Sequence, residues 1–135
     1  MDTSQEYVNM CKKATEMQKL WDMRPLSCDD VLWNETHGFR NKVLDLNPAP
    51  FYQVDSRDEI IIWLPRQDQL QDMVCRDFWG QLQPVNKVTA LLQYFYWWLD
   101  ESPLPEMGSL EQLWLAFAMD KKYHKEWDGN DWIGV

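Results

Sequence analysis

Histidine, cysteine and glycine are scarce in this chain, and each scarcity argues against a class of function. There are two histidines, three cysteines and five glycines among 135 residues. The histidines are far apart and no two cysteines stand at metal-binding spacing, so the sequence supports neither a catalytic triad nor a zinc site. The glycines stand singly, whereas a phosphate-binding loop needs them clustered ahead of a helix. We therefore expect no metal, no cofactor and no P-loop nucleotide hydrolase.

Long apolar runs and an excess of basic charge are also missing. The stretch ALLQYFYWWL at 90–99 is broken by Gln93 and is shorter than the roughly 18 apolar residues of a membrane span. The formal net charge is -9, which opposes non-specific attraction to nucleic acids and anionic membranes. The N-terminus has no basic segment followed by an apolar run, and the odd number of cysteines suits a reducing compartment. The sequence thus predicts a cytosolic protein that binds neither nucleic acid nor membrane.

Tryptophan, in contrast, is abundant. Nine tryptophans are more than a core of this size requires, and this residue type often anchors interfaces or stacks on flat ligands. The hydrophobic content of 45% and the charged content of 26% are those of an ordinary globular protein. We expect a single domain over residues 1–135, with some tryptophan rings at a binding surface.

Apolar periodicity and turn signals predict an α+β fold. A T-x-x-E capping box at Thr3 and Glu6 begins a helix over about residues 4–22, and Pro25 ends it. Short apolar runs separated by turn-forming residues then predict antiparallel strands, at 31–33, 41–46, 51–54 and 59–64. Four successive bulky residues at 60–63 make the last of these the expected central strand.

Three more helices are expected after the strands. Pro65 starts one that ends near Gly80, and another spans about 86–100. The latter is aromatic nearly all round, which predicts contacts on two sides and makes a homo-oligomer a reasonable expectation. A capping box at Ser109 and Gln112 starts the last helix, and an Asp-Gly turn in WDGNDW follows it. The predicted fold is a small antiparallel sheet packed with about four helices in a single compact domain.

Three segments carry a resemblance to a known group of proteins. They are WLPRQDQLQDMV at 63–74, SLEQLWLAFAMDKKYHKEWDGNDW at 109–132, and the N-terminal helix EYVNMCKKATEMQKLW at 6–21. Together they resemble small hypothetical proteins encoded in tailed-phage and prophage genomes of bacteria, over about half of the chain. The resemblance implies a phage origin and a setting in the host cytoplasm. It implies no activity and no catalytic residue.

Arg66 lies in the first turn of the helix expected after Pro65, where the helix dipole favours anions over cations. One interpretation is structural: the arginine forms an ion pair with Asp68 or Asp72, or packs its stem over Leu70. The other is that Arg66 and free backbone N–H groups at this helix start bind an anion. The sequence leaves both interpretations open.

In the ligand-binding interpretation, Trp63 stacks on a base and Gln67 contacts its polar edges. Trp97, in the aromatic run YFYWW, and Trp127, beside the Asp-Gly turn, are the other rings expected to bind the ligand. The basic residues close enough in sequence to help are Lys121, Lys122 and Lys125. The aromatic run also has a simpler interpretation, as a core helix between two layers.

Three hypotheses about function follow. The first is a non-enzymatic phage accessory protein that evades host defence by sequestering a small nucleotide-type immune signal in an aromatic and arginine pocket. The second is an acidic protein–protein inhibitor of a host defence factor, with tryptophan anchors and a surface that mimics nucleic acid. The third is an enzyme, for which the sequence offers no catalytic constellation. No catalytic residue is predicted.

Overall fold

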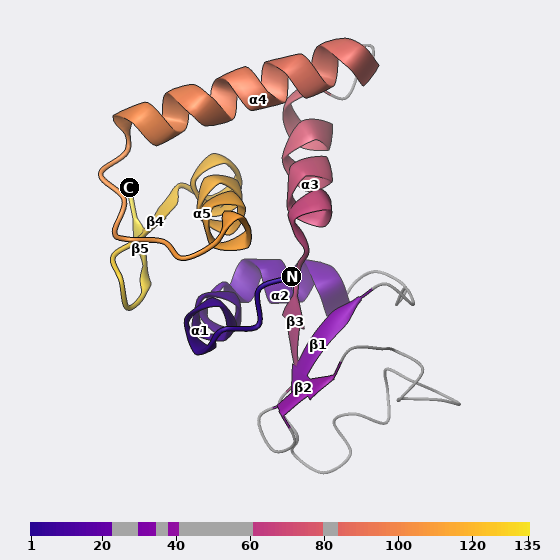
Figure 1. Cartoon of the computed structure of the whole chain (residues 1–135), viewed down its shortest axis with the longest axis vertical. Coiled ribbons are helices and arrows are strands. Elements are labelled where there is room, and N and C mark those ends of the chain that lie inside the picture. The colour runs from indigo at the N-terminus through magenta and orange to yellow at the C-terminus, as the bar shows by residue number, and fades with distance from the viewer. Residues whose placement is uncertain (23–29, 35–37, 41–60, 80–83) are drawn as a thin grey trace. The chain divides into compact units, whose positions relative to one another are not determined.

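The computed structural model describes residues 1–22, 30–34, 38–40, 61–79 and 84–135 (Figure 1). They belong to two compact units, one of Asp2–Pro65 and the other of Arg66–Val135 with Met1. Helices and small antiparallel sheets are both present, so the predicted α+β class with a small sheet and several helices is confirmed. The expectation of one domain for the whole chain stays a prediction.

The N-terminal unit begins with two helices, α1 (Gln5–Lys13) and α2 (Thr15–Asp22). The sequence predicts one continuous helix here, but the chain leaves the helical region at Ala14, where ψ is 66°. The apolar side chains before and after this break still lie on the same side of the two helices. Both helices therefore still bury the predicted residues, which are Tyr7, Cys11, Ala14, Met17 and Trp21.

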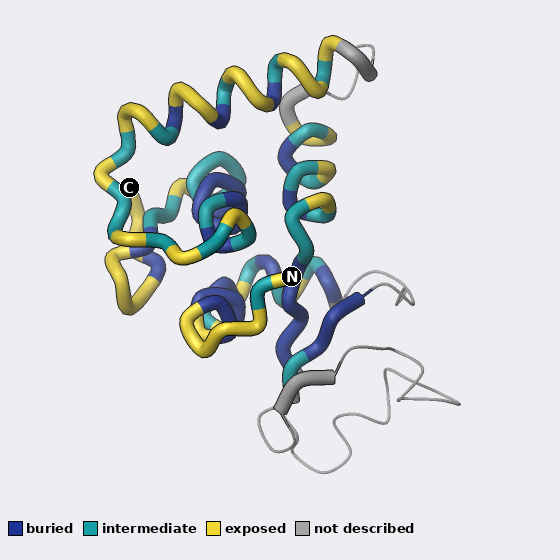
Figure 2. Tube along the Cα trace, viewed as in Figure 1, coloured by how far each residue is buried: buried dark blue, intermediate teal, exposed yellow. Residues whose placement is uncertain are grey.

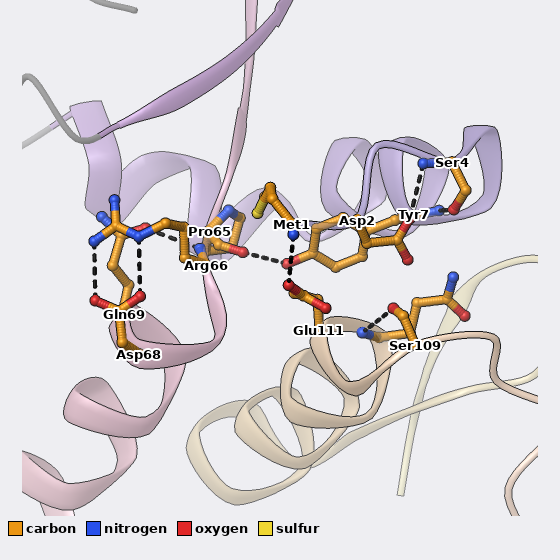
Figure 3. Close-up of polar contacts among 11 residues, drawn as sticks. Met1, Asp2, Ser4, Tyr7, Pro65, Arg66, Asp68, Gln69, Ser109 and Glu111 are labelled. Carbon is orange, nitrogen blue, oxygen red and sulfur yellow. Dashed lines mark hydrogen bonds and ion pairs between the residues drawn. The ribbon is translucent and has the colours of Figure 1, made fainter. Parts of the chain in front are cut away.

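Two hydrogen bonds fix the start of α1 and connect it to the C-terminal end of the N-terminal unit. Ser4 caps α1, since its Oγ accepts a hydrogen bond of 3.2 Å from the Tyr7 N–H. The predicted cap at Thr3 is thus wrong by one residue. The Tyr7 hydroxyl donates to the carbonyl of Pro65, so the first turn of α1 is tied to the end of the unit (Figure 3).

A three-stranded antiparallel sheet completes this unit. Its strands are β1 (Val31–Asn34), β2 (Gly38–Arg40) and β3 (Ile61–Leu64), in the order β2-β1-β3. Leu32 of β1 lies opposite both Arg40 of β2 and Trp63 of β3. Among the described strands β1 is therefore central, and not β3, where 60–63 were expected to form the central strand. The strands expected at 41–46 and 51–54 lie outside the described residues.

Gln18 of α2 completes the hydrogen bonding of β3. Its Nε2 donates to the Trp63 carbonyl at 3.0 Å, and its Oε1 accepts from the Trp63 N–H at 2.9 Å. The same Nε2 donates to the Cys11 carbonyl at 3.0 Å. One side-chain amide thus takes the place of a neighbouring strand at Trp63 and links β3 to both helices.

The C-terminal unit contains three helices, α3 (Gln67–Trp79), α4 (Pro84–Glu101) and α5 (Leu110–Tyr123). Helix α3 packs against both of the others (Figure 1). It begins two residues after Pro65, later than predicted, because Gln69 accepts a hydrogen bond of 2.9 Å from the Arg66 N–H and so caps the helix at Arg66. None of the helices in the described ranges is both long and apolar enough to cross a membrane.

The capping box predicted for α5 is confirmed. Ser109 Oγ accepts from the Gln112 N–H at 3.2 Å (Figure 3). Gln112 Oε1 in turn accepts from the Gly108 N–H at 2.8 Å, one residue before Ser109. The helix ends at His124, which has a left-handed backbone with φ of 54°. Its first and last turns therefore have defined polar partners.

A β-hairpin follows α5, with strands β4 (Lys125–Trp127) and β5 (Trp132–Gly134). The predicted Asp-Gly turn joins them, and Asp128 Oδ1 accepts hydrogen bonds of 2.7 Å from the N–H groups of Asn130 and Asp131. The two strands themselves are not predicted, because three residues carry too little periodicity to distinguish a strand from a loop.

Candidate functional site

Helix α4 has one buried and one exposed side. On the buried side, Phe95 stacks on Trp114 of α5, with ring centroids 3.9 Å apart and planes 8° apart. Trp98 meets Phe117 of α5 edge to face at 5.2 Å. Figure 2 shows buried positions recurring among exposed ones from Leu91 to Trp98. The aromatic run therefore contributes to the core, as its simpler interpretation predicts, but not with all of its rings.

The exposed side of α4 carries large apolar side chains. Val88, Leu92, Tyr96 and Trp97 are between 54% and 67% exposed. Val88, Leu92 and Tyr96 follow one another at four-residue spacing and form one ridge, whereas Trp97 lies on another side of the helix. Each side borders a hollow within the C-terminal unit.

The first hollow lies between α3 and α4, and we call it the α3/α4 groove. Its volume is about 260 Å³. Val88, Leu91 and Leu92 provide the apolar lining from α4. Helix α3 provides a mostly polar lining of Asp68, Gln71, Asp72 and Cys75. The groove thus combines an apolar floor with an acidic rim.

Both carboxylates of this rim have arginine partners. Arg66 donates from Nε and Nη2 to the two carboxylate oxygens of Asp68, each at 2.9 Å (Figure 3). These hydrogen bonds, more than the charge of Arg66, hold the pKa of Asp68 below its usual value. Asp72 pairs with Arg76 at 2.6 Å, with side chains 57% and 78% exposed. An exposed pair of this kind contributes at most about 1 kcal/mol, so Asp72 can exchange its partner at little cost. Arg66 is less accessible, with a side chain 29% exposed, and it holds Asp68 by two hydrogen bonds.

The second hollow, which we call the α4 pocket, lies at the C-terminal end of α4. Its volume is about 380 Å³. Its lining from α4 is Tyr94, Trp97, Trp98 and Glu101, a set at helical spacing that shares one face. The rest of the lining is Ser102, Pro103, Lys121 of α5 and Glu126 of β4. The pocket is therefore mainly aromatic on one side and charged on the other.

Lys121 is already engaged within the α4 pocket. Its Nζ lies 2.9 Å from Asp120 Oδ2 and 5.0 Å from the centroid of the Tyr94 ring. Burial on its own lowers the pKa of the Lys121 ammonium, but the hydrogen bond and charge of Asp120, with a contribution from Tyr94, outweigh it and the pKa is raised. The charge of Lys121 is thus matched locally, and Glu101 and Glu126 leave the pocket with an excess of negative charge.

The residues predicted to bind a ligand differ in exposure and in the partners that surround them. Arg66 is held by Asp68, which confirms the ion pair offered as its structural interpretation. Its backbone N–H is bonded to Gln69, so this group is not available to an anion. Gln67 is half-buried at the first position of α3.

The three predicted tryptophans differ in exposure. Trp63, in β3 of the N-terminal unit, is 1% exposed, and Trp127 is 4% exposed, with its ring 5.0 Å from that of Trp132. Neither ring presents a face to a ligand in this structure. Trp97 is 54% exposed and lines the α4 pocket.

Two carboxylates of the α4 pocket are absent from the predicted set. Glu101 follows Trp97 by four residues and Trp98 by three, so helical spacing could have identified it. Glu126 comes from β4, and no local signal connects it to α4. Within the described ranges, no group of three or more histidine, cysteine, aspartate or glutamate side chains is placed to hold a metal ion.

Comparison with known proteins assigns no family to this chain. No family model, no curated protein and no solved structure matches it. The function is therefore inferred from the groove and the pocket themselves.

Proposed function

We propose that this protein acts without catalysis, by binding a basic amphipathic helix of a partner protein in the α3/α4 groove. The observation that carries the proposal is the exposed apolar ridge of Val88, Leu92 and Tyr96 beside that groove. A helix that binds another helix typically does so through large apolar side chains at such three- or four-residue spacing. The proposal follows the inhibitor hypothesis rather than the signal-capture hypothesis.

The size of the groove favours side chains of a partner over a whole small molecule. Its 260 Å³ falls below the range of about 300–1,000 Å³ typical of ligand pockets. It is open along the ridge of α4, where Leu92 is 54% exposed. A few apolar side chains from one face of a helix fit such a site, because the backbone of that helix remains outside it.

Charge favours a basic partner. The chain carries a net charge of -9, and the groove is bordered by Asp68 and Asp72. Lysine and arginine side chains flanking the apolar face of the partner can compete with Arg66 and Arg76 for these carboxylates. Because both members of the Asp72 and Arg76 pair are exposed, competition for Asp72 costs little.

Capture of a nucleotide-type signal has weaker support. Arg66 is occupied by Asp68, and the buried rings of Trp63 and Trp127 offer no stacking surface. That the partner is a host protein, and that the protein works in the host cytoplasm, rests on the resemblance of 63–74 and 109–132 to phage-encoded proteins.

The proposal is tested with a labelled model peptide that forms a helix with leucines on one face and lysines on the other. Fluorescence anisotropy measures its binding to the full chain. We expect Leu92→Glu to weaken binding about tenfold or more, because it removes the burial of one leucine side chain and places a carboxylate in the apolar floor. Higher ionic strength should weaken binding to the unaltered protein as well.

Two controls make the result specific. Gln93→Glu adds the same charge one residue away but outside the groove lining, and should leave binding unchanged. A peptide with glutamates in place of lysines should bind much more weakly. Equal binding of both peptides, or no effect of Leu92→Glu, would contradict the proposal. Light scattering tests self-association: a dimer that Leu92→Glu makes monomeric would mean that a second copy occupies the groove, and would also overturn it.

A further inference from the structure

The α4 pocket lies on another side of α4 from the Val88 and Leu92 ridge, and its chemistry differs from that of the groove. We infer that it binds a small organic cation, such as a quaternary ammonium or an alkylguanidinium group, against the Trp97 indole and beside the carboxylates of Glu101 and Glu126. This inference is independent of the proposed function, since none of the residues lining the pocket lines the α3/α4 groove.

The aromatic lining is the first reason. Trp97 is 54% exposed and lines the pocket together with Tyr94 and Trp98. Indole is the best of the aromatic faces for a cation, and attraction extends to about 6 Å from the ring centroid. Trp98 is held by its contact with Phe117, so the pocket has a fixed wall beside the exposed Trp97 ring. The pocket volume of 380 Å³ lies within the range typical of small-ligand sites.

The charges of the lining are the second reason. Glu101 and Glu126 are both in the lining, whereas the single lysine there, Lys121, is neutralised by Asp120 at 2.9 Å. Helix α4 ends at Glu101, so the pocket also lies at the negative end of that helix dipole. These contributions act in the same direction, in favour of a cation and against an anion.

The ammonium group of Lys121 is a cation that already lies in the lining of the pocket, and its contacts are the third reason. Its ammonium lies 5.0 Å from the Tyr94 ring centroid and 5.9 Å from that of Phe117. Its pKa is raised although burial opposes this, because Asp120 outweighs the loss of water. An aromatic wall with a nearby carboxylate therefore already stabilises one ammonium here, and Trp97 with Glu101 and Glu126 offers the same combination to a second.

Choline is the first probe, and its control is the neutral isostere in which a tert-butyl group replaces trimethylammonium. The readout is the Trp97 indole N–H resonance in a proton–nitrogen correlation spectrum, assigned by its absence in Trp97→Phe. We expect choline, but not sodium chloride at the same concentration, to shift this resonance saturably. The isostere should shift it much less, because a cation–π contact and two carboxylates act only on the charged ligand.

Matched variants test the carboxylates. Glu101→Gln should weaken choline binding roughly three- to tenfold. Asp100→Asn removes the same charge from the neighbouring residue, which does not line the pocket, and should leave the affinity unchanged within about twofold. Leu92→Glu should not affect choline binding, and Glu101→Gln should not affect peptide binding in the groove, so either proposal can fail without the other.

A comparison of choline with N-acetyl-argininamide distinguishes a free small molecule from an arginine side chain of a partner as the source of the cation. Tighter binding of either one supports a cation site and identifies its source. The inference is overturned if the isostere binds as well as choline, if Glu101→Gln and Asp100→Asn have equal effects, or if neither cation moves the Trp97 resonance.

Discussion

The phenyl ring of Phe95 lies flat on the indole ring of Trp114, with centroids 3.9 Å apart and planes 8° apart. Phe95 also meets Trp98 at 5.9 Å and Phe117 at 5.3 Å, so it joins rings of both helices in the aromatic cluster between α4 and α5. Phe117 of α5 is the common member of this cluster, since it contacts Tyr94, Trp98 and Trp114 as well. This cluster positions α4 so that Trp97 and Leu92 remain exposed. The groove and the pocket both depend on it.

We expect Phe95→Ala to lower the free energy of unfolding of the C-terminal unit by about 3–5 kcal/mol, because it leaves a cavity and removes three ring contacts. Urea denaturation monitored by tryptophan fluorescence measures this change. Tyr96→Ala is the control, since this neighbouring ring is 67% exposed and its loss should cost about 0.5 kcal/mol or less. Equal effects of the two substitutions would mean that the Phe95 ring does not pack in the cluster as the structure shows.

A second prediction concerns Gln18 and the N-terminal unit. Gln18→Ala should destabilise this unit by about 1–3 kcal/mol, because the N–H and C=O of Trp63 both lose the partner that Gln18 provides. Gln18→Glu should restore only the acceptor, and so only part of the loss. Lys19→Ala, on the exposed neighbour, is the control. Amide hydrogen exchange at Trp63 is the most direct measurement, and unchanged protection in Gln18→Ala would contradict the bonding described.

The pair of Arg66 and Asp68 predicts a dependence on pH. The hydrogen bonds from Arg66 lower the pKa of Asp68 from its usual 3.8, so the stability contributed by the pair is present above that value and is lost as pH falls through the lowered pKa. The contribution should be below about 1 kcal/mol, since the Asp68 side chain is 67% exposed.

A carboxyl titration followed by carbon NMR measures this effect at the residue itself. In Arg66→Ala the midpoint of Asp68 should rise towards 3.8, because the two hydrogen bonds are gone. Arg76→Ala, which removes a cation from the same helix without touching Asp68, is the control. An unchanged midpoint in Arg66→Ala would mean that the pair does not persist in solution.

The cysteines should react at different rates. Cys11 is fully buried, and burial raises the pKa of its thiol, so the reactive thiolate is suppressed. Cys75 is half-buried in the lining of the α3/α4 groove. In a Cys28→Ser background, we expect iodoacetamide to modify Cys75 first and Cys11 only on unfolding, as mass spectrometry of tryptic peptides would show.

The same labelling reports on the groove. A bound helix should protect Cys75 from iodoacetamide, whereas choline in the α4 pocket should not. Protection of Cys75 by choline would contradict the assignment of choline to a site separate from the groove. Modification of Cys11 as fast as Cys75 in the folded protein would contradict the burial of Cys11.

Part of this fold was predictable from local patterns, and part was not. The capping box of Ser109 and Gln112 and the start of β1 at Val31 were correctly predicted, because both depend on residues close together in the chain. The break at Ala14 and the central position of β1 were missed. Helical periodicity continues across Ala14, and strand order depends on partners that are distant in sequence.

The candidate site was less predictable than the fold. Of the three tryptophans predicted to bind a ligand, Trp97 is exposed, whereas the structure buries Trp63 and Trp127. All three look alike in sequence, since each is a tryptophan near a turn or a polar residue. Arg66 had two open interpretations, and the structure shows the ion pair with Asp68 that the structural one predicts.

The sequence by itself determined the acidic charge, the approximate helical segments, the cap of α5 at Ser109, and the lack of any metal or phosphate motif. These properties follow from residue type and from spacing within one or two turns. Only the tertiary structure decided which rings of α4 are buried, and that Glu101 and Glu126 share a pocket with Trp97. Burial and proximity depend on how α4 packs against α3, α5 and the hairpin, and local spacing carries no information about that packing.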